Sequence, residues 1–222
     1  MNGRRDPALA RIAALDTATV SDALDRLGVL GQCHGIAPRA HAFRMAGRAH
    51  TLSYCMAANP AGSVGDYIDD VAPGSVLLLD NGGRDTETVW GDILTEIAHR
   101  RGIAGTVIDG ICRDVQLCLD LGYPIFSRGH WMRTGKDRVQ LEAVNVPVTI
   151  GGVRAAAGDL VFGDADGVVI VPALFEERVL SLAEEISSVE ERIRLAVRSG
   201  RRLDDARREF GYHTLQSRES AR

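Results

Sequence analysis

Apolar residues recur along the chain with two spacings, which predict the order of helices and strands. The elements expected in the first 71 residues are helices at 7–15 and 19–27, a loop at 29–45, a strand at 47–55 and a short helix at 62–71. Thr17 and Thr19 are capping-type residues at the start of the second helix, and Gly28 is a typical helix stop.

From residue 75 the pattern alternates between short apolar runs and amphipathic stretches of about ten residues. It predicts strands at 75–80, 105–109 and 123–127, separated by helices at 92–101 and 114–121. Strands that alternate with helices are joined by crossover connections, which place them parallel in one sheet. The expected fold class is therefore α/β with a partly parallel central sheet.

Beyond Gly129 the pattern changes to short apolar runs between tight glycine turns. These runs predict hairpin strands at 146–150, 159–162 and 167–171. Apolar steps of three and four residues then predict one long C-terminal helix at 173–198, whose apolar stripe should lie in the core or against another subunit. Residues 199–222 are polar and rich in arginine, so we expect a peripheral tail or arm after a single domain at 1–198.

The composition is that of a soluble globular protein, with 45% hydrophobic and 25% charged residues in a chain of 222. A net charge of −4 provides no basic surface for nucleic acid. No apolar run approaches the ~20 residues that span a bilayer, and the first six residues lack the apolar run of a signal peptide. We therefore expect a cytoplasmic protein with neither a nucleic-acid nor a membrane partner.

Lysine is nearly absent, and this excludes several kinds of site. Lys136 is the only lysine, and it is followed by Asp137 rather than the Ser or Thr of a phosphate-binding P-loop. Schiff-base chemistry would have to use Lys136, whose polar neighbours predict a solvated turn. The four cysteines are too widely spaced for a zinc cluster and are expected to be free thiols.

Two loops at the carboxyl ends of predicted strands hold the residue types that chemistry needs, and ligands of open α/β sheets bind at such ends. A helix beginning at Asp92 would leave the N–H groups of Ile93 and Leu94 free to bind a carboxylate or phosphate. Arg113 could hold a carboxylate or an enolate oxygen. Asp92 and Asp114, with Asp109 as a further candidate, offer the oxygen ligands that Mg²⁺ or Mn²⁺ accepts.

Each of these residues also has a simpler role. Asp92 and Asp114 could be helix caps, and Arg113 could form a surface ion pair with Asp114. Asp80 and Asp109 are common turn residues at strand ends. Only the convergence of two such loops on one crevice favours a functional site.

Five motifs together resemble the RraA-like family and cover most of residues 17–172. They are TVSDALDRLG at 19–28, WGDIL at 90–94, GTVIDGICRDV at 105–115, YPIFSRG at 123–129 and GDLVFGDADGVVIVP at 158–172. The resemblance implies a swivelling β/β/α sandwich, a homotrimer or a hexamer, and an active site in a cleft between subunits.

The family includes metal-dependent aldolases for 4-hydroxy-4-methyl-2-oxoglutarate and 4-carboxy-4-hydroxy-2-oxoadipate. By that resemblance Asp114 would ligate a divalent metal, and Asp92 would hold a metal-bound water. Arg113 would contact the pyruvyl oxygen, while the amides of Ile93 and Leu94, with Gly91 beside them, would bind the pyruvyl carboxylate. The chain is then expected to be a metal-dependent lyase that cleaves a small 4-hydroxy-2-oxo acid to pyruvate, with oxaloacetate decarboxylation as a side activity.

Two questions stay open at this point. The family also contains regulators that bind and inhibit a ribonuclease, so a non-catalytic protein of that kind is the alternative. Specificity for the rest of the substrate is expected to depend on one or more of four cations, namely Arg84, Arg128, Arg133 and Lys136.

Overall fold

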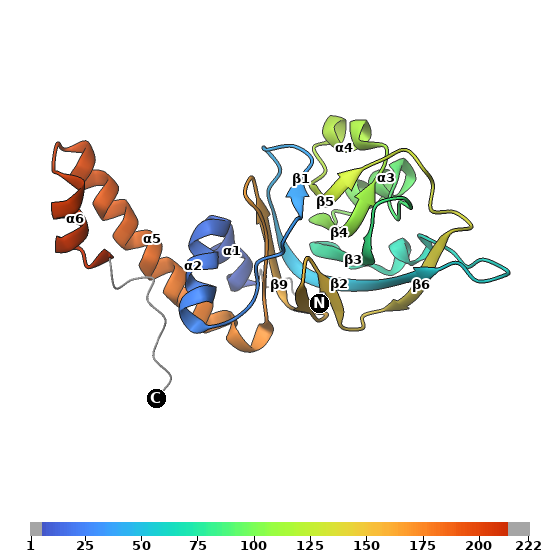
Figure 1. Ribbon diagram of the computed structural model, residues 1–222, viewed down its shortest axis with the longest axis horizontal. Coiled ribbons are helices and arrows are strands. Elements are labelled where there is room, and N and C mark those ends of the chain that lie inside the picture. The colour runs from blue at the N-terminus through green and yellow to red at the C-terminus, as the bar shows by residue number, and fades with distance from the viewer. Residues whose placement is uncertain (1–5, 213–222) are drawn as a thin grey trace.

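The structure of the chain is a computed structural model that describes residues 6–212. A strongly curved sheet forms its centre, with helices packed on it and one long helix leading away from the body (Figure 1). The strands of this sheet are β1 (Ala37–Pro38), β2 (Met45–Met56), β3 (Ser75–Arg84), β4 (Gly105–Cys112), β5 (Ile125–His130), β6 (Val139–Val144), β9 (Leu160–Asp164) and β10 (Gly167–Val171).

The order of the strands confirms the partly parallel sheet. It runs β1-β5-β4-β3-β2-β9-β10, with β6 also paired to β2. The pairs β2–β3, β3–β4 and β4–β5 are parallel, whereas β9, β10, β6 and β1 are antiparallel to their neighbours. The parallel strands β3 and β4 therefore end at the same edge of the sheet, where their following loops meet.

The sheet nearly closes on itself through the segment that contains β1. Gln32 forms a bridge with Val169 of β10, and Ala37 pairs with Ser127 of β5 at the opposite edge. A separate hairpin of β7 (Val148–Ile150) and β8 (Val153–Ala155) packs against the ends of β3 and β4. Closure of this kind covers the edge strands that an open sheet would expose.

The helices form two groups, each with its own apolar cluster. One cluster joins β9 and β10 to α1 (Pro7–Ala13), α2 (Thr17–Leu27) and the inner part of α5 (Glu176–Arg198). The other packs α3 (Asp92–Arg100) and α4 (Val115–Leu121) on the parallel strands. Two 3₁₀ segments complete the helices: η1 (Asp66–Asp70) contacts α3, and η2 (Ala173–Phe175) contacts α5.

Local sequence explains where the first helices begin and end. Asp16, not Thr17, caps α2, since its side chain accepts from the Thr19 amide at 2.7 Å. Gly28 ends α2 with φ of 66°, a conformation that glycine adopts without a steric cost. The predicted start of this helix was therefore two residues late.

Three expectations need correction. Of the helix predicted at 62–71, only η1 forms, because Gly62 and Gly65 disfavour a longer helix. Residues 139–144, for which no element was expected, form β6, whose alternating pattern VQLEAV suits a strand with one buried side. The segment predicted as a polar tail contains a helix, α6 (Leu203–Glu209), which contacts α5 and buries Ala206.

Residues 213–222 of that predicted tail lie outside the described residues. Within the described part of the chain, none of the helices combines the length and the apolar character needed to cross a membrane.

Candidate active site

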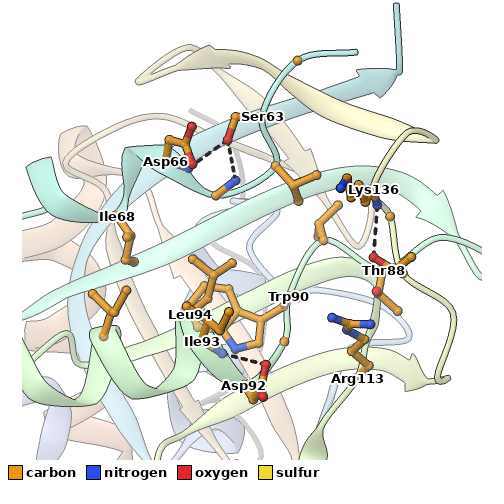
Figure 2. Close-up of a pocket in the computed structure, with 18 of the residues that line it drawn as sticks. Ser63, Asp66, Ile68, Thr88, Trp90, Asp92, Ile93, Leu94, Arg113 and Lys136 are labelled. Atoms are coloured by element: carbon orange, nitrogen blue, oxygen red, sulfur yellow. Dashed lines mark hydrogen bonds between the residues drawn. The ribbon is translucent and has the colours of Figure 1, made fainter.

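The loops after β3 and β4 meet at a cleft of about 820 Å³. One wall is the segment from Ser63 to Ile68, which includes the start of η1, and the opposite wall is the start of α3 (Figure 2). Trp90 lies between these walls, while Arg113 and Lys136 lie on one side of the view. A cleft of this size suits a small organic ligand.

Backbone and side-chain hydrogen bonds join the two loops directly. The Arg113 amide donates to the Trp90 carbonyl at 3.2 Å. The Asp92 amide donates to Oδ2 of Asp114 at 3.1 Å, and Nε of Arg113 lies 3.3 Å from the same oxygen. The structure therefore brings Asp92, Arg113 and Asp114 together, as the sequence predicts.

Asp114 does not act as an ordinary helix cap. It precedes α4 in the left-handed conformation, with φ of 57°, and its side chain makes no capping bond to that helix. A non-glycine residue in this region is uncommon and costs conformational energy. The surrounding contacts hold the Asp114 carboxylate toward α3 instead, which excludes the simple capping role for this residue.

Gly91 lets the two loops approach each other this closely. A Cβ atom at this position would lie 2.9 Å from Oδ2 of Asp114 and 3.1 Å from Nε of Arg113. Both distances are shorter than ordinary contacts, so any side chain at Gly91 would displace the carboxylate and the guanidinium. Glycine at position 91 thus allows the Asp114 carboxylate and the Arg113 guanidinium to pack against the start of α3.

The first turn of α3 differs in part from the expectation. The Ile93 amide, expected to be unpaired, donates to Oδ1 of Asp92 at 2.8 Å. The Leu94 amide has no acceptor among the described residues. Because the N-terminus of a helix attracts anions, Leu94 offers the amide most directly available to a carboxylate.

Trp90 anchors the start of α3. Its Nε1 donates to Oγ1 of Thr95 at 2.9 Å, and that hydroxyl donates to the Gly91 carbonyl at 3.0 Å. The Trp90 ring stacks on Tyr123 with a centroid separation of 6.0 Å. These buried contacts fix the backbone beside Asp92, a role that the sequence pattern did not reveal.

Asp80 and Asp109 lie outside this cluster. They end the strands predicted from sequence, but in the structure they lie within the longer strands β3 and β4. Asp109 is 5% exposed and accepts from Nε of Arg128 and from the Gly151 amide. Asp80 accepts from the amides of Gly82 and Thr149, each at 2.9 Å. These two carboxylates hold the β7–β8 hairpin against the sheet, so the suggestion of Asp109 as a metal ligand is replaced by a structural role.

The donor set at the site fits a magnesium-like ion. Mg²⁺ is usually held by one or two carboxylates and completes its octahedron with water and substrate oxygens. Asp92 lines the cleft, and Asp114 lies beside it through its bond to the Asp92 amide, so two such carboxylates are close together. In residues 6–212 no group of three or more His, Cys, Asp or Glu side chains is placed to hold a metal ion.

The cysteine beside the site is not a nucleophile. Cys112 is fully buried, and burial raises the pKa of its thiol to about 11. Nucleophilic attack requires the thiolate, which is scarce at neutral pH when the pKa is this high. All four cysteines are free thiols, as the sequence predicts.

The cleft also contains residues that the sequence did not single out. The segment Ser63 to Ile68 forms a whole wall, in which Oγ of Ser63 accepts from the amides of Gly65 and Asp66 at 3.2 Å (Figure 2). The sequence predicted only a short helix over 62–71, and no motif marked this segment as part of a site.

Comparison with known proteins gives one consistent family. The RraA-like family, described as Aldolase/RraA, matches residues 17–170. The chain is 34% identical over 177 residues to a protein of Halalkalibacterium halodurans named "Putative 4-hydroxy-4-methyl-2-oxoglutarate aldolase", covering 80% of this chain and 82% of that protein.

Two further proteins are similar to this chain, one compared by sequence and one by structure. Protein DlpA of Legionella pneumophila is 36% identical over 207 residues, which cover 92% of this chain but only 34% of the length of DlpA. The crystal structure of Streptomyces coelicolor RraAS2, described as an unusual member of the RNase ES inhibitor RraA protein family, superposes with a TM-score of 0.78. The two aligned chains are 28% identical, and the alignment covers 86% of this chain and 98% of RraAS2.

Proposed function

The chain belongs to the RraA-like family of aldolases and RraA proteins, and from that premise we propose that it is a divalent-metal-dependent pyruvyl aldolase. Its reaction would cleave a 4-hydroxy-2-oxo acid, such as 4-hydroxy-4-methyl-2-oxoglutarate, to pyruvate. The observation that carries the proposal is the carboxylate of Asp114, held away from its own helix and against Asp92 and Arg113 at the cleft. A relative named as an aldolase for that substrate supports the same reaction.

Asp114 would ligate the divalent ion, Mg²⁺ or Mn²⁺, and Asp92 would hold water beside that ion. When bound, the ion would act as a Lewis acid on the 2-oxo group and carboxylate of the substrate. Both side chains have exposed oxygens for this purpose, because neither residue is buried.

Arg113 would stabilise the oxygen that gains negative charge as the carbon–carbon bond breaks. Its Nε lies beside Asp114, so the carboxylate orients the guanidinium fork. Preorganised donors at a developing charge are the largest catalytic contribution in many enzymes. The fixed charge of Arg113 would thus stabilise the transition state in which the carbon–carbon bond breaks.

The amide of Leu94 and the N-terminal end of α3 would bind the substrate carboxylate. Ile93 would contribute its N–H only if Asp92 turned away from it, because that N–H donates to Oδ1 of Asp92 in this structure. Oδ2 of Asp92 would orient the water that accepts the proton of the 4-hydroxyl group. The two oxygens of the Asp92 carboxylate would thus act separately: Oδ1 accepts the Ile93 N–H, and Oδ2 would orient the water.

Two further properties belong to the proposal. Decarboxylation of oxaloacetate yields the same pyruvate enolate, so it is the expected side activity. We also propose a homotrimer or a hexamer, as the resemblance to the RraA-like family implies. The long helix α5 extends beyond the body (Figure 1) and exposes Leu195 and Val197 near its end, which suits a contact with another subunit.

The test is pyruvate release from 4-hydroxy-4-methyl-2-oxoglutarate and from oxaloacetate, coupled to lactate dehydrogenase, with Mg²⁺, with Mn²⁺ and with a chelator. An enzyme-free blank corrects for spontaneous decay of oxaloacetate, and Asp114→Ala is the matched inactive variant. Release that requires metal and is lost in Asp114→Ala supports the aldolase. No release above the blank with any metal would contradict it.

A second function is favoured by one comparison, the structural similarity to RraAS2. A regulator of this type would bind a ribonuclease through a protein surface and would need no turnover. Tight binding of a ribonuclease by the purified chain, unchanged in Arg113→Ala and without any lyase activity, would support the regulator in place of the enzyme.

A further inference from the structure

Thr95 lies fully buried about one turn after Asp92 in α3, and the proposed mechanism leaves its hydroxyl without a task. Nε1 of Trp90 donates to Oγ1 of Thr95 at 2.9 Å, and Oγ1 donates to the Gly91 carbonyl at 3.0 Å. Sγ of Cys118, in α4, lies 3.3 Å from the same oxygen. The hydroxyl thus contacts both the loop after β3 and the helix that follows β4.

The direction of the Thr95–Cys118 hydrogen bond follows from the chemistry of the two groups. A hydroxyl has one hydrogen and two acceptor positions, and the hydrogen of Thr95 is used by the Gly91 carbonyl. Cys118 is fully buried, and burial raises the pKa of its thiol, so the thiol keeps its hydrogen at neutral pH. The thiol therefore donates to Oγ1, which also accepts from the Trp90 indole. All three hydrogen-bonding positions of the hydroxyl are filled.

The Gly91 carbonyl and the Asp92 amide belong to one peptide group, and this group joins Thr95 to the active site. The carbonyl accepts from the Thr95 amide at 3.0 Å and from the Thr95 hydroxyl at 3.0 Å. The amide on the other side of the same peptide group donates to Oδ2 of Asp114 at 3.1 Å. Because a peptide group is planar and rigid, fixing its carbonyl also fixes the direction in which its N–H points. Thr95 thereby sets the direction of the bond that holds the Asp114 carboxylate.

The contact between Thr95 and Cys118 is a second link between α3 and α4. The first is the bond from the Asp92 amide to Asp114, at the start of both helices. Thr95 follows Asp92 by three residues, and Cys118 follows Asp114 by four. The second link therefore lies about one turn further along each helix. Two links one turn apart hold the starts of the two helices in one relative orientation.

Folding alone does not require a hydroxyl at position 95. The other buried residue of α3 is Ala98, which is apolar. Valine has nearly the shape of threonine and brings no buried polar group that needs a partner. Threonine also has only a modest helix propensity. The buried hydroxyl is thus better explained by the groups that it holds than by packing.

We propose that Thr95 is a positioning residue for Asp114. Its hydroxyl fixes the peptide group between Gly91 and Asp92, and that peptide group orients the carboxylate that would ligate the divalent ion. The inference rests on the proposed function, because it takes the role of Asp114 from there. It adds a residue that touches neither substrate nor metal and acts through the backbone. Loss of a group that orients a metal ligand typically weakens metal binding by about 10- to 100-fold.

The experiment measures the affinity of the full chain for Mn²⁺, by electron paramagnetic resonance of the free ion, with no substrate present. Thr95→Val removes the hydroxyl and keeps the branched side chain, and it should raise the Kd for Mn²⁺ by about tenfold or more. Thr95→Ser keeps the hydroxyl and should restore most of the affinity. Thr95→Ala, which favours a helix, carries the same expectation as Thr95→Val and replaces it if that variant does not fold.

Thr51→Val is the matched control. Thr51 is also fully buried, its Oγ1 donates to the Val146 carbonyl at 2.6 Å, and neither residue lines the cleft. This substitution should lower the midpoint of urea unfolding, as Thr95→Val does, and leave the Kd for Mn²⁺ unchanged. An unchanged Kd in Thr95→Val, an equal rise in Thr51→Val, or a rise that Thr95→Ser shares would each overturn the inference and leave Thr95 a structural role.

The aldolase proposal fails separately from this one. Its test is pyruvate release, whereas Thr95 is tested by metal binding alone. A rise in Kd in Thr95→Val, when the unsubstituted chain releases no pyruvate, would keep the positioning role and reject the aldolase. Metal-dependent pyruvate release with an unchanged Kd in Thr95→Val would do the reverse. An unsubstituted chain that binds no Mn²⁺ would overturn this inference and the proposed metal dependence together.

Discussion

Oδ2 of Asp114 accepts the backbone amide of Asp92 at 3.1 Å, although 22 residues separate them in the chain. This contact joins the start of α3 to the end of β4 and sets the spacing of the two carboxylates. It also uses an N–H of a helix N-terminus that would otherwise need a cap. The proposed active site therefore doubles as the structural junction between two loops, and the predictions below separate these roles.

Arg113→Lys should lower kcat for pyruvate release by about 100-fold or more, because a lysine keeps the charge but loses the planar fork. Arg113 is only partly buried, so the free energy of unfolding should change by less than about 1 kcal/mol. Steady-state kinetics and urea unfolding of the same preparation provide both values. An unchanged kcat would remove Arg113 from the chemistry.

Gly91→Ala should lower activity with little effect on stability. The backbone at Gly91 is extended, which any residue adopts, so the only conflict is with the side chains of Asp114 and Arg113. Displacement of such groups by about 1 Å can cost on the order of 100-fold in rate. Gly129→Ala is the control, since its Cβ would meet only Ile111 at an ordinary 3.6 Å. Full activity in Gly91→Ala would show that the close approach is not needed.

Asp109→Ala should affect stability rather than chemistry. The substitution leaves Arg128 and the Gly151 amide without their buried acceptor, which should lower the free energy of unfolding by about 2–3 kcal/mol. Asp85→Ala, at an exposed position, should change it by less than about 0.5 kcal/mol. The comparison uses urea unfolding followed by circular dichroism. Equal midpoints for the two variants would contradict the structural role of Asp109.

The buried thiols should resist alkylation in the folded protein. Burial raises the pKa of Cys33 to about 12 and that of Cys112 to about 11, so both stay protonated at pH 8. Raising the pH from 7 to 9 should therefore leave both unlabelled by iodoacetamide, whereas unfolding in urea should expose all four cysteines. Peptide mass spectrometry identifies the labelled positions. Rapid labelling of Cys112 in the native state would be the contrary result.

The sequence predicted the parallel strands, the long helix and the pairing of two polar loops, because each depends on local periodicity or on the position of a strand end. It did not separate the aspartates. Asp80 and Asp109 end the predicted strands, which made them candidates beside Asp92 and Asp114. Only the β7–β8 hairpin, distant in sequence, shows that the oxygens of Asp80 and Asp109 are already engaged.

The segment around Lys136 is an exposed turn, as its polar sequence predicts. The sequence did not show that Thr88 and Cys112 hold this turn beside the cleft. These contacts join segments more than 15 residues apart, so no local pattern contains them. The role of Gly91 was hidden for the same reason, since the atoms that exclude a side chain there come from Arg113 and Asp114.

The aspartates at this end of the sheet differ in how much folding stability their loss would remove. Asp109 is buried, whereas Asp92 and Asp114 are exposed and the bond that joins them lies at the surface, so their exchange should lower the free energy of unfolding less than exchange of Asp109. One or two surface substitutions could therefore remove the proposed lyase activity and leave the fold in place. A loss of activity that leaves the fold intact fits a family in which similar folds are named both as aldolases and as inhibitors of a ribonuclease.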